Sequence, residues 1–330
     1  MAVFVTGASG FLGGRLAELL ADRGHEVVVL ARASADLRHL AHVPVRVVAG
    51  SLGDLETLKR AMSGVTQIFH CAAASTDWAS KEMFFDANVR GTENMLAAAT
   101  VASELQRFVH VSTTDVYGYP LVPCGEDALV QDVGLGYNHT KVLGEQAAWR
   151  AHREQGLPVT IIRPATIYGP RGKAFVTDFE ELLRIRLMAY IDGGQRTGGF
   201  TYVDTVAEAM MAAAQSERTL GRAYNISDGT GGTWREYVEG LAAGLGYRTP
   251  WLKLSFQSAM LLARAMEFPH GTLGLPGRPQ LTRHAVYLLG RDQEFPNAKA
   301  RQDFGFAPEI DLAEGIRRSV EWLHSLPKWV

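Results

Sequence analysis

Tyr137 and Lys141 are four residues apart, which places both side chains on one face of the helix expected over residues 137–155. A phenol titrates at about pH 10, too high for a base that works at neutral pH. A neighbouring ammonium stabilises the phenolate and lowers the phenol pKa, so the pair is suited to proton transfer. The alternative is a chance pair, because roughly one chain in five of this composition would show the same spacing.

Hydroxyl side chains follow directly after the apolar segment 107–111, in the sequence Ser112-Thr113-Thr114. We expect that segment to be a strand of a parallel sheet, and ligands bind at the carboxyl ends of such strands. The hydroxyls also lie upstream of the helix that carries Tyr137. Together these observations favour an active site over a chance pair.

The chain begins with an apolar segment that leads into a G-x-x-G-x-x-G loop formed by Gly7, Gly10 and Gly13. Glycine lets the backbone approach a diphosphate closely, and the helix expected over residues 11–23 directs its N-terminal N–H groups and positive dipole end at the phosphates. A glycine triplet alone can be an ordinary strand–helix turn. Its position between a strand and an amphipathic helix favours a dinucleotide site.

The first half of the chain alternates short apolar segments with helical stretches, the pattern of a parallel sheet covered by helices on both faces. Strands are predicted at residues 2–5, 25–30, 44–49, 66–70, 107–111 and 159–162, and helices at 11–23, 35–42, 54–63, 80–102 and 137–155. After Pro164 the alternation ends, and residues 233–330 are predicted to be mostly helical.

We therefore expect two domains. A dinucleotide-binding domain covers residues 1–165, with 197–228 returning to it, and a substrate-binding lid covers 166–196 and 229–330.

Composition is that of an ordinary globular enzyme, with 330 residues, 47% hydrophobic and 21% charged. The formal net charge of −2 gives no basic footprint for nucleic acid. Two cysteines make neither a disulfide framework nor a metal-ligand pattern. No apolar run approaches the roughly 18 residues of a membrane span, and we expect no signal peptide before the first strand. We expect a cytoplasmic, metal-free protein whose partner is a small-molecule substrate.

Several segments together resemble the extended short-chain dehydrogenase/reductases, the superfamily that holds nucleotide-sugar epimerases and 3β-hydroxysteroid dehydrogenases. The matching segments span nearly the whole chain: 6–13, 70–73, 88–92, 111–118, 137–141, 163–170 and 202–204. The resemblance implies an α/β fold, a Rossmann-type doubly wound parallel sheet with a smaller, mostly helical C-terminal lid. It also implies a homodimer through helices 80–102 and 137–155, for which packing within one monomer is the alternative.

The resemblance implies roles for individual residues. Tyr137 is expected to be the acid/base, Lys141 its tuner and a ribose contact, and Thr113 a hydrogen-bond donor to the substrate oxygen. Asn88 has a supporting role or only satisfies local backbone. Besides the glycines, Tyr137 and Lys141, the expected cofactor contacts are Phe11, Leu12, Arg32, Ser34, Ser51, Leu52, Cys71, Ala72, Ala73, Pro164 and Thr166.

The end of the second strand bears on cofactor choice. NAD-binding sites of this fold usually carry an acidic residue about 20 residues past the glycines. This chain has Arg32 and Ser34 there, and no acid before Asp36. A guanidinium binds phosphate oxygens in a fork, so Arg32 predicts a preference for NADP, with NAD possible if Arg32 is only a solvated surface residue. Ser51 stands where the family often has an aspartate that contacts adenine.

Three reaction classes compete: an oxidoreductase, a nucleotide-sugar epimerase or dehydratase, and a non-catalytic cofactor-sensing protein. The intact Thr113, Tyr137 and Lys141 disfavour the third. Dehydratases of this superfamily follow the threonine with two acids, and here one is lost, since the residues are Thr114 and Asp115.

The diphosphate clamp of the sugar-nucleotide enzymes is also weak, because Gly198 and Gly199 occupy its place, with Arg196 upstream. Segments 277–283 and 300–306 resemble the 3β-hydroxysteroid dehydrogenase-like branch. The sequence therefore predicts an NAD(P)-dependent oxidoreductase for a secondary alcohol or ketone of a hydrophobic or mid-sized substrate. A nucleotide-sugar or sugar-like epimerase is the alternative.

Overall fold

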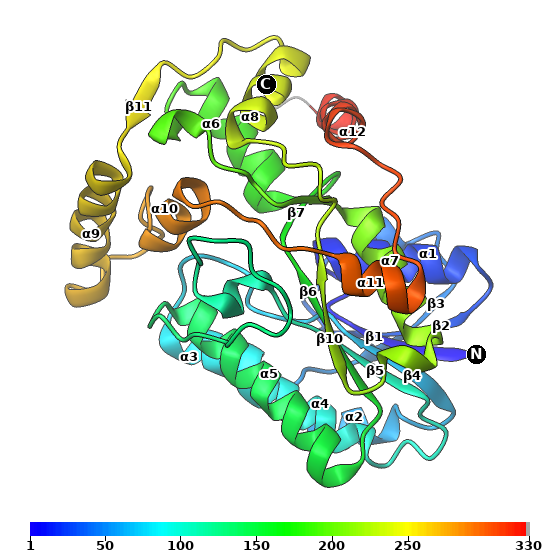
Figure 1. The fold of residues 1–330 in the computed structure, drawn as a ribbon. Helices are drawn as coiled ribbons and strands as arrows, with labels where there is room; N and C mark the ends of the chain where they lie inside the picture. The colour runs from blue at the N-terminus through cyan, green and yellow to red at the C-terminus, as the bar shows by residue number, and fades with distance from the viewer. Residues whose placement is uncertain (328–330) are drawn as a thin grey trace.

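The computed structural model describes residues 1–327, and a seven-stranded parallel sheet forms its centre (Figure 1). The strands are β1 (Ala2–Thr6), β2 (Glu26–Ala31), β3 (Val45–Ala49), β4 (Val65–His70), β5 (Arg107–Val111), β6 (Val159–Pro164) and β10 (Arg222–Ile226). Their order is β10-β6-β5-β4-β1-β2-β3, so the chain winds outward in two directions from the β1/β4 junction. Ligands bind at the carboxyl edge beside such a junction. The predicted doubly wound α/β fold is confirmed.

Helices cover both faces of this sheet, because its central strands are apolar on both sides. One face carries α1 (Phe11–Asp22), α7 (Val203–Gln215) and α11 (Ala298–Phe304). The other carries α2 (Leu55–Arg60), α4 (Gly91–Ala99) and α5 (Gly136–Gln155).

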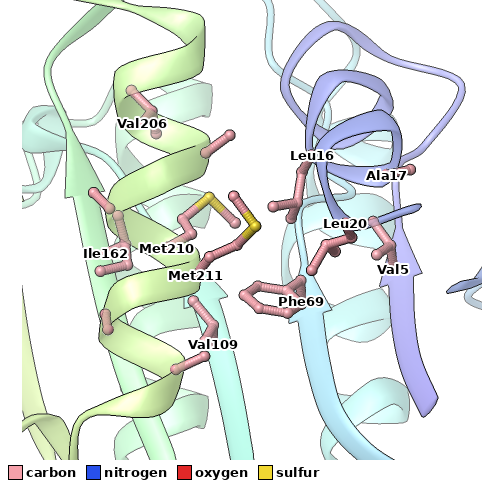
Figure 2. Close-up of a cluster of buried hydrophobic side chains, with 14 of the residues drawn as sticks. Val5, Leu16, Ala17, Leu20, Phe69, Val109, Ile162, Val206, Met210 and Met211 are labelled. Carbon is pink, nitrogen blue, oxygen red and sulfur yellow. The ribbon is translucent and has the colours of Figure 1, made fainter. Parts of the chain in front are cut away.

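The core between α1, α7 and the sheet holds the first glycine loop in place. Figure 2 shows Leu16 and Leu20 of α1 facing Met210 and Met211 of α7, with Phe69 of β4 between the two helices. All five side chains are buried. Burying a side chain of this size contributes roughly 1.5–3 kcal/mol, so this cluster fixes the α1 N-terminus against the sheet.

The C-terminal part forms a layer over the carboxyl edge of the sheet (Figure 1), and we refer to it as the lid. Its helices are α6 (Asp178–Arg184), α8 (Trp234–Leu245), α9 (Phe256–Thr272), α10 (Arg283–Gly290) and α12 (Leu312–Ser325). Two small parallel sheets add to it, pairing β7 (Thr166–Tyr168) with β9 (Phe200–Tyr202) and β8 (Ala189–Ile191) with β11 (Leu252–Leu254). Its core is aromatic, and ring contacts connect Tyr168, Phe200, Trp234 and Tyr237 into one cluster.

The helix predicted over residues 35–42 is wrong, because only Arg38–Leu40 form a single 3₁₀ turn. The Asp36 carboxylate accepts the backbone N–H of Arg38 at 3.0 Å and also binds its guanidinium. Such local side-chain bonds compete with helix formation.

The helix predicted over 80–102 is present as Lys81–Ala99, in which α3 (Lys81–Phe85) joins α4 through a π-helical turn, Asp86–Arg90. None of the helices within residues 1–327 is long and apolar enough to cross a membrane.

Candidate active site

The glycine loop is tightly folded beneath the N-terminus of α1. Gly7 has a φ of +74°, and a Cβ there would lie 2.7 Å from the backbone nitrogen of Ala72. A Cβ at Gly13 would lie 2.5 Å from the carbonyl oxygen of Gly7. Gly10 begins the helix without a side-chain cap, so the first N–H groups of α1 are free of side-chain partners. This loop fits the diphosphate of a dinucleotide.

The other predicted cofactor contacts all follow strands at the same edge. Phe11 and Leu12 open α1, Arg32 and Ser34 follow β2, Ser51 and Leu52 follow β3, Cys71, Ala72 and Ala73 follow β4, Pro164 ends β6, and Thr166 begins β7. The loop after β4 is fixed because the Ala72 N–H donates to the Thr6 hydroxyl at 3.1 Å. The buried Thr166 hydroxyl has no partner among residues 1–327. These residues fit a nicotinamide dinucleotide lying across the edge.

Arg32 is exposed, and within the described chain no side chain binds its guanidinium. The nearby Arg38 is different, because its guanidinium is held by Asp36 at 2.6 Å. Of the two arginines in this loop, Arg32 is therefore the one with donors available for a 2′-phosphate.

Tyr137 lies in the first turn of α5, and its phenol meets two hydroxyls. The pKa of the phenol is raised above its usual value, mainly by burial and also by the Asp115 carboxylate. Hydrogen bonding with Ser75 and Thr113 opposes this shift but does not cancel it. Thr113 is itself held in place, because its hydroxyl accepts the Asp115 N–H at 3.2 Å. The structure thus brings Thr113 close to Tyr137, and it adds Ser75, which sequence reasoning missed. The net shift of the phenol pKa is upward, opposite to the lowering that the sequence predicted from Lys141, because burial and the Asp115 carboxylate outweigh the other effects.

Lys141 lies one turn further along α5, and it is buried. Its ammonium donates to the Val111 carbonyl at 2.6 Å, at the end of β5. Burial lowers the pKa of this ammonium to about 8, although the negative charge of Glu145 acts in the other direction and raises it. Lys141 is thus fixed between α5 and the sheet edge.

Asn88 lies in the π-helical turn and connects two other elements. Its amide donates to the Thr140 hydroxyl of α5 at 3.0 Å, and its side-chain oxygen accepts the Ala74 N–H at 2.7 Å. It therefore bonds across elements rather than to local backbone. The helices approach so closely here that a Cβ at Gly144 would lie 2.4 Å from the Asn88 carbonyl oxygen.

A buried ion pair behind Lys141 anchors α5 to the sheet. The carboxylate of Glu145 pairs with the guanidinium of Arg163 on β6, and both side chains are at most 4% exposed. Glu145 also accepts the Ser112 hydroxyl at 2.6 Å. Arg163 donates to the Tyr117 hydroxyl at 2.7 Å. No periodicity in the sequence indicates this network, because its members come from three separate elements.

Above Tyr137, the lid contributes His284 from the first turn of α10. The imidazole stacks on the phenol ring, with centroids 5.6 Å apart and planes inclined by 17°. Its Nε2 lies 3.0 Å from the Asp115 carboxylate, which also accepts the Tyr119 hydroxyl at 3.0 Å. Sequence reasoning missed this contact because 169 residues separate Asp115 from His284.

The lid turn before α10 is held by a second carboxylate. Asp77, in the loop after β4, binds the Arg278 guanidinium at 2.7 Å and the Thr282 hydroxyl at 2.7 Å. Thr282 also caps α10 by accepting the Ala285 N–H at 3.1 Å. Asp77 and Asp115 thus fix the lid over the phenol.

A sequence model of the NAD dependent epimerase/dehydratase family matches residues 3–227. The chain is 33% identical over 319 residues to 4-hydroxy-2-methyl-3-oxo-4-farnesyl-3,4-dihydroquinoline-1-oxide ketoreductase of Stigmatella aurantiaca, covering 96% of this chain and 95% of the relative. It is 32% identical over 327 residues to 2-alkyl-3-oxoalkanoate reductase of Stenotrophomonas maltophilia, covering 96% and 98%.

A more distant relative is 3 beta-hydroxysteroid dehydrogenase/Delta 5→4-isomerase of Mycobacterium tuberculosis, 29% identical over 98% of this chain and 90% of the relative. Among solved structures, the crystal structure of gox2253 superposes with a TM-score of 0.80 at 27% identity, covering 98% of both chains.

Proposed function

Because the chain belongs to the NAD-dependent epimerase/dehydratase family, in the 3β-hydroxysteroid dehydrogenase-like branch of the extended short-chain dehydrogenase/reductases, we propose that it reduces the ketone of a hydrophobic, mid-sized substrate with NADPH. The observation that carries the proposal is the meeting of Tyr137 and Thr113 at the carboxyl edge of the sheet, with Lys141 one turn away on the same helix. An enzyme of this kind is an oxidoreductase, and a bound nicotinamide supplies the hydride.

The protein's own groups handle the oxygen of the substrate. Thr113 and Tyr137 present hydroxyls that can hold the carbonyl oxygen, and the phenol donates its proton as that oxygen gains charge. The raised pKa of Tyr137 keeps the phenol protonated at neutral pH, which suits an acid in the reducing direction. Lys141 carries a positive charge one turn away on the same helix, and in this proposal that charge stabilises the phenolate left after transfer.

Arg32 supports NADP over NAD. It has no partner to displace within the described residues, and a guanidinium binds the 2′-phosphate in a charge-assisted fork. The absence of an acid at the end of β2 removes the group that would hold a free 2′-hydroxyl and repel the phosphate.

Two contacts disfavour the epimerase and dehydratase alternatives. Arg196, the nearest candidate for a diphosphate clamp, is paired with Asp292 at 2.9 Å, so its charge is already neutralised. Asp115 is occupied by His284 and Tyr119, so it is not a free acid for water elimination. The names of the Stigmatella aurantiaca and Stenotrophomonas maltophilia relatives both describe the reduction of an oxo compound. Both names also include an apolar substituent, a farnesyl or an alkyl group.

We also propose that the protein forms a homodimer through the helical segments 80–102 and 137–155. Met83 and Phe85 are 56% and 37% exposed on the first of these segments, and a paired helix would cover them. Light scattering coupled to gel filtration tests this, and a monomer at micromolar concentration contradicts it.

The reductase function is tested by following NADPH oxidation with keto-steroids, 3-oxo esters, plain alkyl ketones and nucleotide sugars. We expect turnover with one of the three ketone classes and none with the sugars. The Tyr137→Phe variant should bind NADPH normally and lose on the order of a thousandfold or more in turnover. Redox-neutral conversion of a nucleotide sugar without NADPH consumption contradicts the proposal and supports the epimerase.

A further inference from the structure

We propose that the outward face of α9, at the edge of the lid, docks on the surface of a membrane that carries anionic lipids. This attachment goes beyond the proposed reductase function and does not depend on it. The apolar side chains that α9 exposes and the charges around them point to such a surface.

Helix α9 lies at the outer margin of the lid, away from the central sheet (Figure 1). Its inner face packs on β8 and α10, and Ala259 and Ala263 of that face are completely buried. The buried Glu267 carboxylate accepts the backbone N–H of Arg283 at 2.6 Å and pairs with its guanidinium. These contacts fix which face of the helix points outward.

The outward face of α9 is apolar, the reverse of an ordinary surface helix. The exposed residues at positions i, i+1, i+4 and i+7 of its middle turns all lie opposite the buried alanines: Leu261, Leu262, Ala265 and Phe268. Leu261 is 71% exposed and Phe268 is 65% exposed. A helix on the surface of a globular protein presents polar residues on its outer face. Because α9 is apolar on both faces, its outer face calls for an apolar surface outside the lid.

The segments on either side of α9 extend this apolar surface along the chain. Trp251, directly before β11, is exposed, and so are Leu273 and Leu275, directly after α9. Residues 251–275 thus contain six of the large apolar side chains that are exposed in the described chain. Exposed apolar surface that is concentrated in this way marks an interaction site.

The charges of this region identify the partner as an anionic surface. Between residues 248 and 277 the only acidic residue is Glu267, which is buried and already paired with Arg283. Arg248, Lys253 and Arg264 are exposed in the same stretch, and none of them forms an ion pair within residues 1–327. A helix with an exposed apolar face and flanking cations lies in the headgroup region of a membrane, where anionic lipids attract the cations.

A membrane fits this face better than a second copy of the chain does. In a two-fold interface the same patch of both copies meets, so the cations around α9 would face each other. No exposed acid lies between residues 248 and 277 to compensate them, and like charges across an interface weaken it. An anionic bilayer supplies the opposite charge and the apolar interior at once.

Co-sedimentation of the full chain with lipid vesicles tests the proposal. We expect binding to phosphatidylcholine vesicles that contain about 30% phosphatidylglycerol, and weaker binding to pure phosphatidylcholine, because anionic headgroups attract the cations. Added salt should weaken the binding to the anionic vesicles. No binding at about 1 mM anionic lipid overturns the proposal, as does equal binding to both kinds of vesicle.

The double variant Leu261→Ser/Phe268→Ser tests the apolar face. Both side chains are exposed, so the melting temperature should stay close to that of the wild type. The vesicle binding constant should fall about a hundredfold or more, because burial of each side chain in lipid contributes about a tenfold factor or more.

Val101→Ser/Leu220→Ser is the matched control for that variant. It also removes two exposed apolar side chains, but these precede β5 and β10 and lie at the sheet edge opposite the lid. The control should bind vesicles like the wild type. Equal vesicle binding by the two double variants overturns the assignment to α9.

Arg264→Gln tests the charge separately. The binding constant for anionic vesicles should fall about fivefold, and that for pure phosphatidylcholine should stay unchanged. Arg153→Gln, on an exposed arginine near the end of α5, should change neither. Sedimentation velocity distinguishes the other occupant of this face. If the wild type binds no vesicles but shows a self-association that Leu261→Ser/Phe268→Ser abolishes, the face joins two copies and the membrane proposal is overturned.

Discussion

Glu145→Gln should lower the melting temperature by several degrees. Glu145 is not among the residues that we propose to bind the substrate, so the expected effect is on stability. The substitution removes the negative charge next to Arg163, whose side chain is 4% exposed and remains a buried cation. Breaking one partner of a buried ion pair costs about 3–5 kcal/mol. An unfolding entropy of about 2.1 cal/mol/K per residue gives about 0.7 kcal/mol/K for 330 residues. The expected shift is therefore about 4 to 7 °C.

Differential scanning calorimetry measures this shift, and Glu93→Gln is the matched control. Glu93 pairs with Arg150 of the same helix α5 at 3.5 Å, but both side chains are about half exposed, at 48% and 50%. Exposed pairs contribute about 1 kcal/mol at most, so the control should move the melting temperature by less than about 1.5 °C. Equal shifts in the two variants would refute the argument that the buried pair anchors α5.

Lys141→Met should move the rising limb of the pH–rate profile for alcohol oxidation to higher pH. Oxidation needs the phenolate of Tyr137, and loss of the ammonium should raise the phenol pKa further. An unchanged profile contradicts the proposed effect of Lys141 on the pKa of Tyr137. Arg32→Ala should raise the dissociation constant of NADPH by about one to two decades and leave that of NADH nearly unchanged. Titrations with both cofactors measure this. Equal losses of affinity would mean that Arg32 does not bind the 2′-phosphate. Gly144→Ala should lower the melting temperature and activity together, since its Cβ would lie 2.4 Å from the Asn88 carbonyl oxygen. Scanning calorimetry and the reductase assay check this, and a native-like variant would show that α5 and the π-helical turn can separate at little cost.

Local sequence patterns predicted the parts of the fold that depend on neighbours in the chain. The glycine loop depends on one strand–helix turn, and the Tyr137–Lys141 spacing depends on one helical turn, so the sequence could predict both. The structure places them at one sheet edge. The prediction of a helix over 35–42 was wrong because the Asp36 side chain accepts the backbone N–H of Arg38 locally. The roles of the site residues stay predictions until the variants are measured.

The lid was much harder to predict, for a physical reason. Its strands β7, β8 and β11 are three residues long and pair with distant segments, so no alternation in the sequence marks them. His284 reaches Asp115 only because Asp77 and Thr282 join the lid turn to the loop after β4. Contacts of this kind depend on the tertiary arrangement, and a single sequence contains no signal for them.

The winding of the sheet in two directions from the β1/β4 junction has a consequence for how such enzymes can diversify. The loops after β2 and β3, which carry Arg32 and Ser51, lie on one flank of the junction, and α5 with Tyr137 lies on the other. Exchanges in the first flank can alter the proposed coenzyme contacts while leaving Tyr137, the proposed proton donor, in place. Coenzyme preference and carbonyl specificity are therefore separately mutable traits in this architecture, and an engineer can change one before attempting the other.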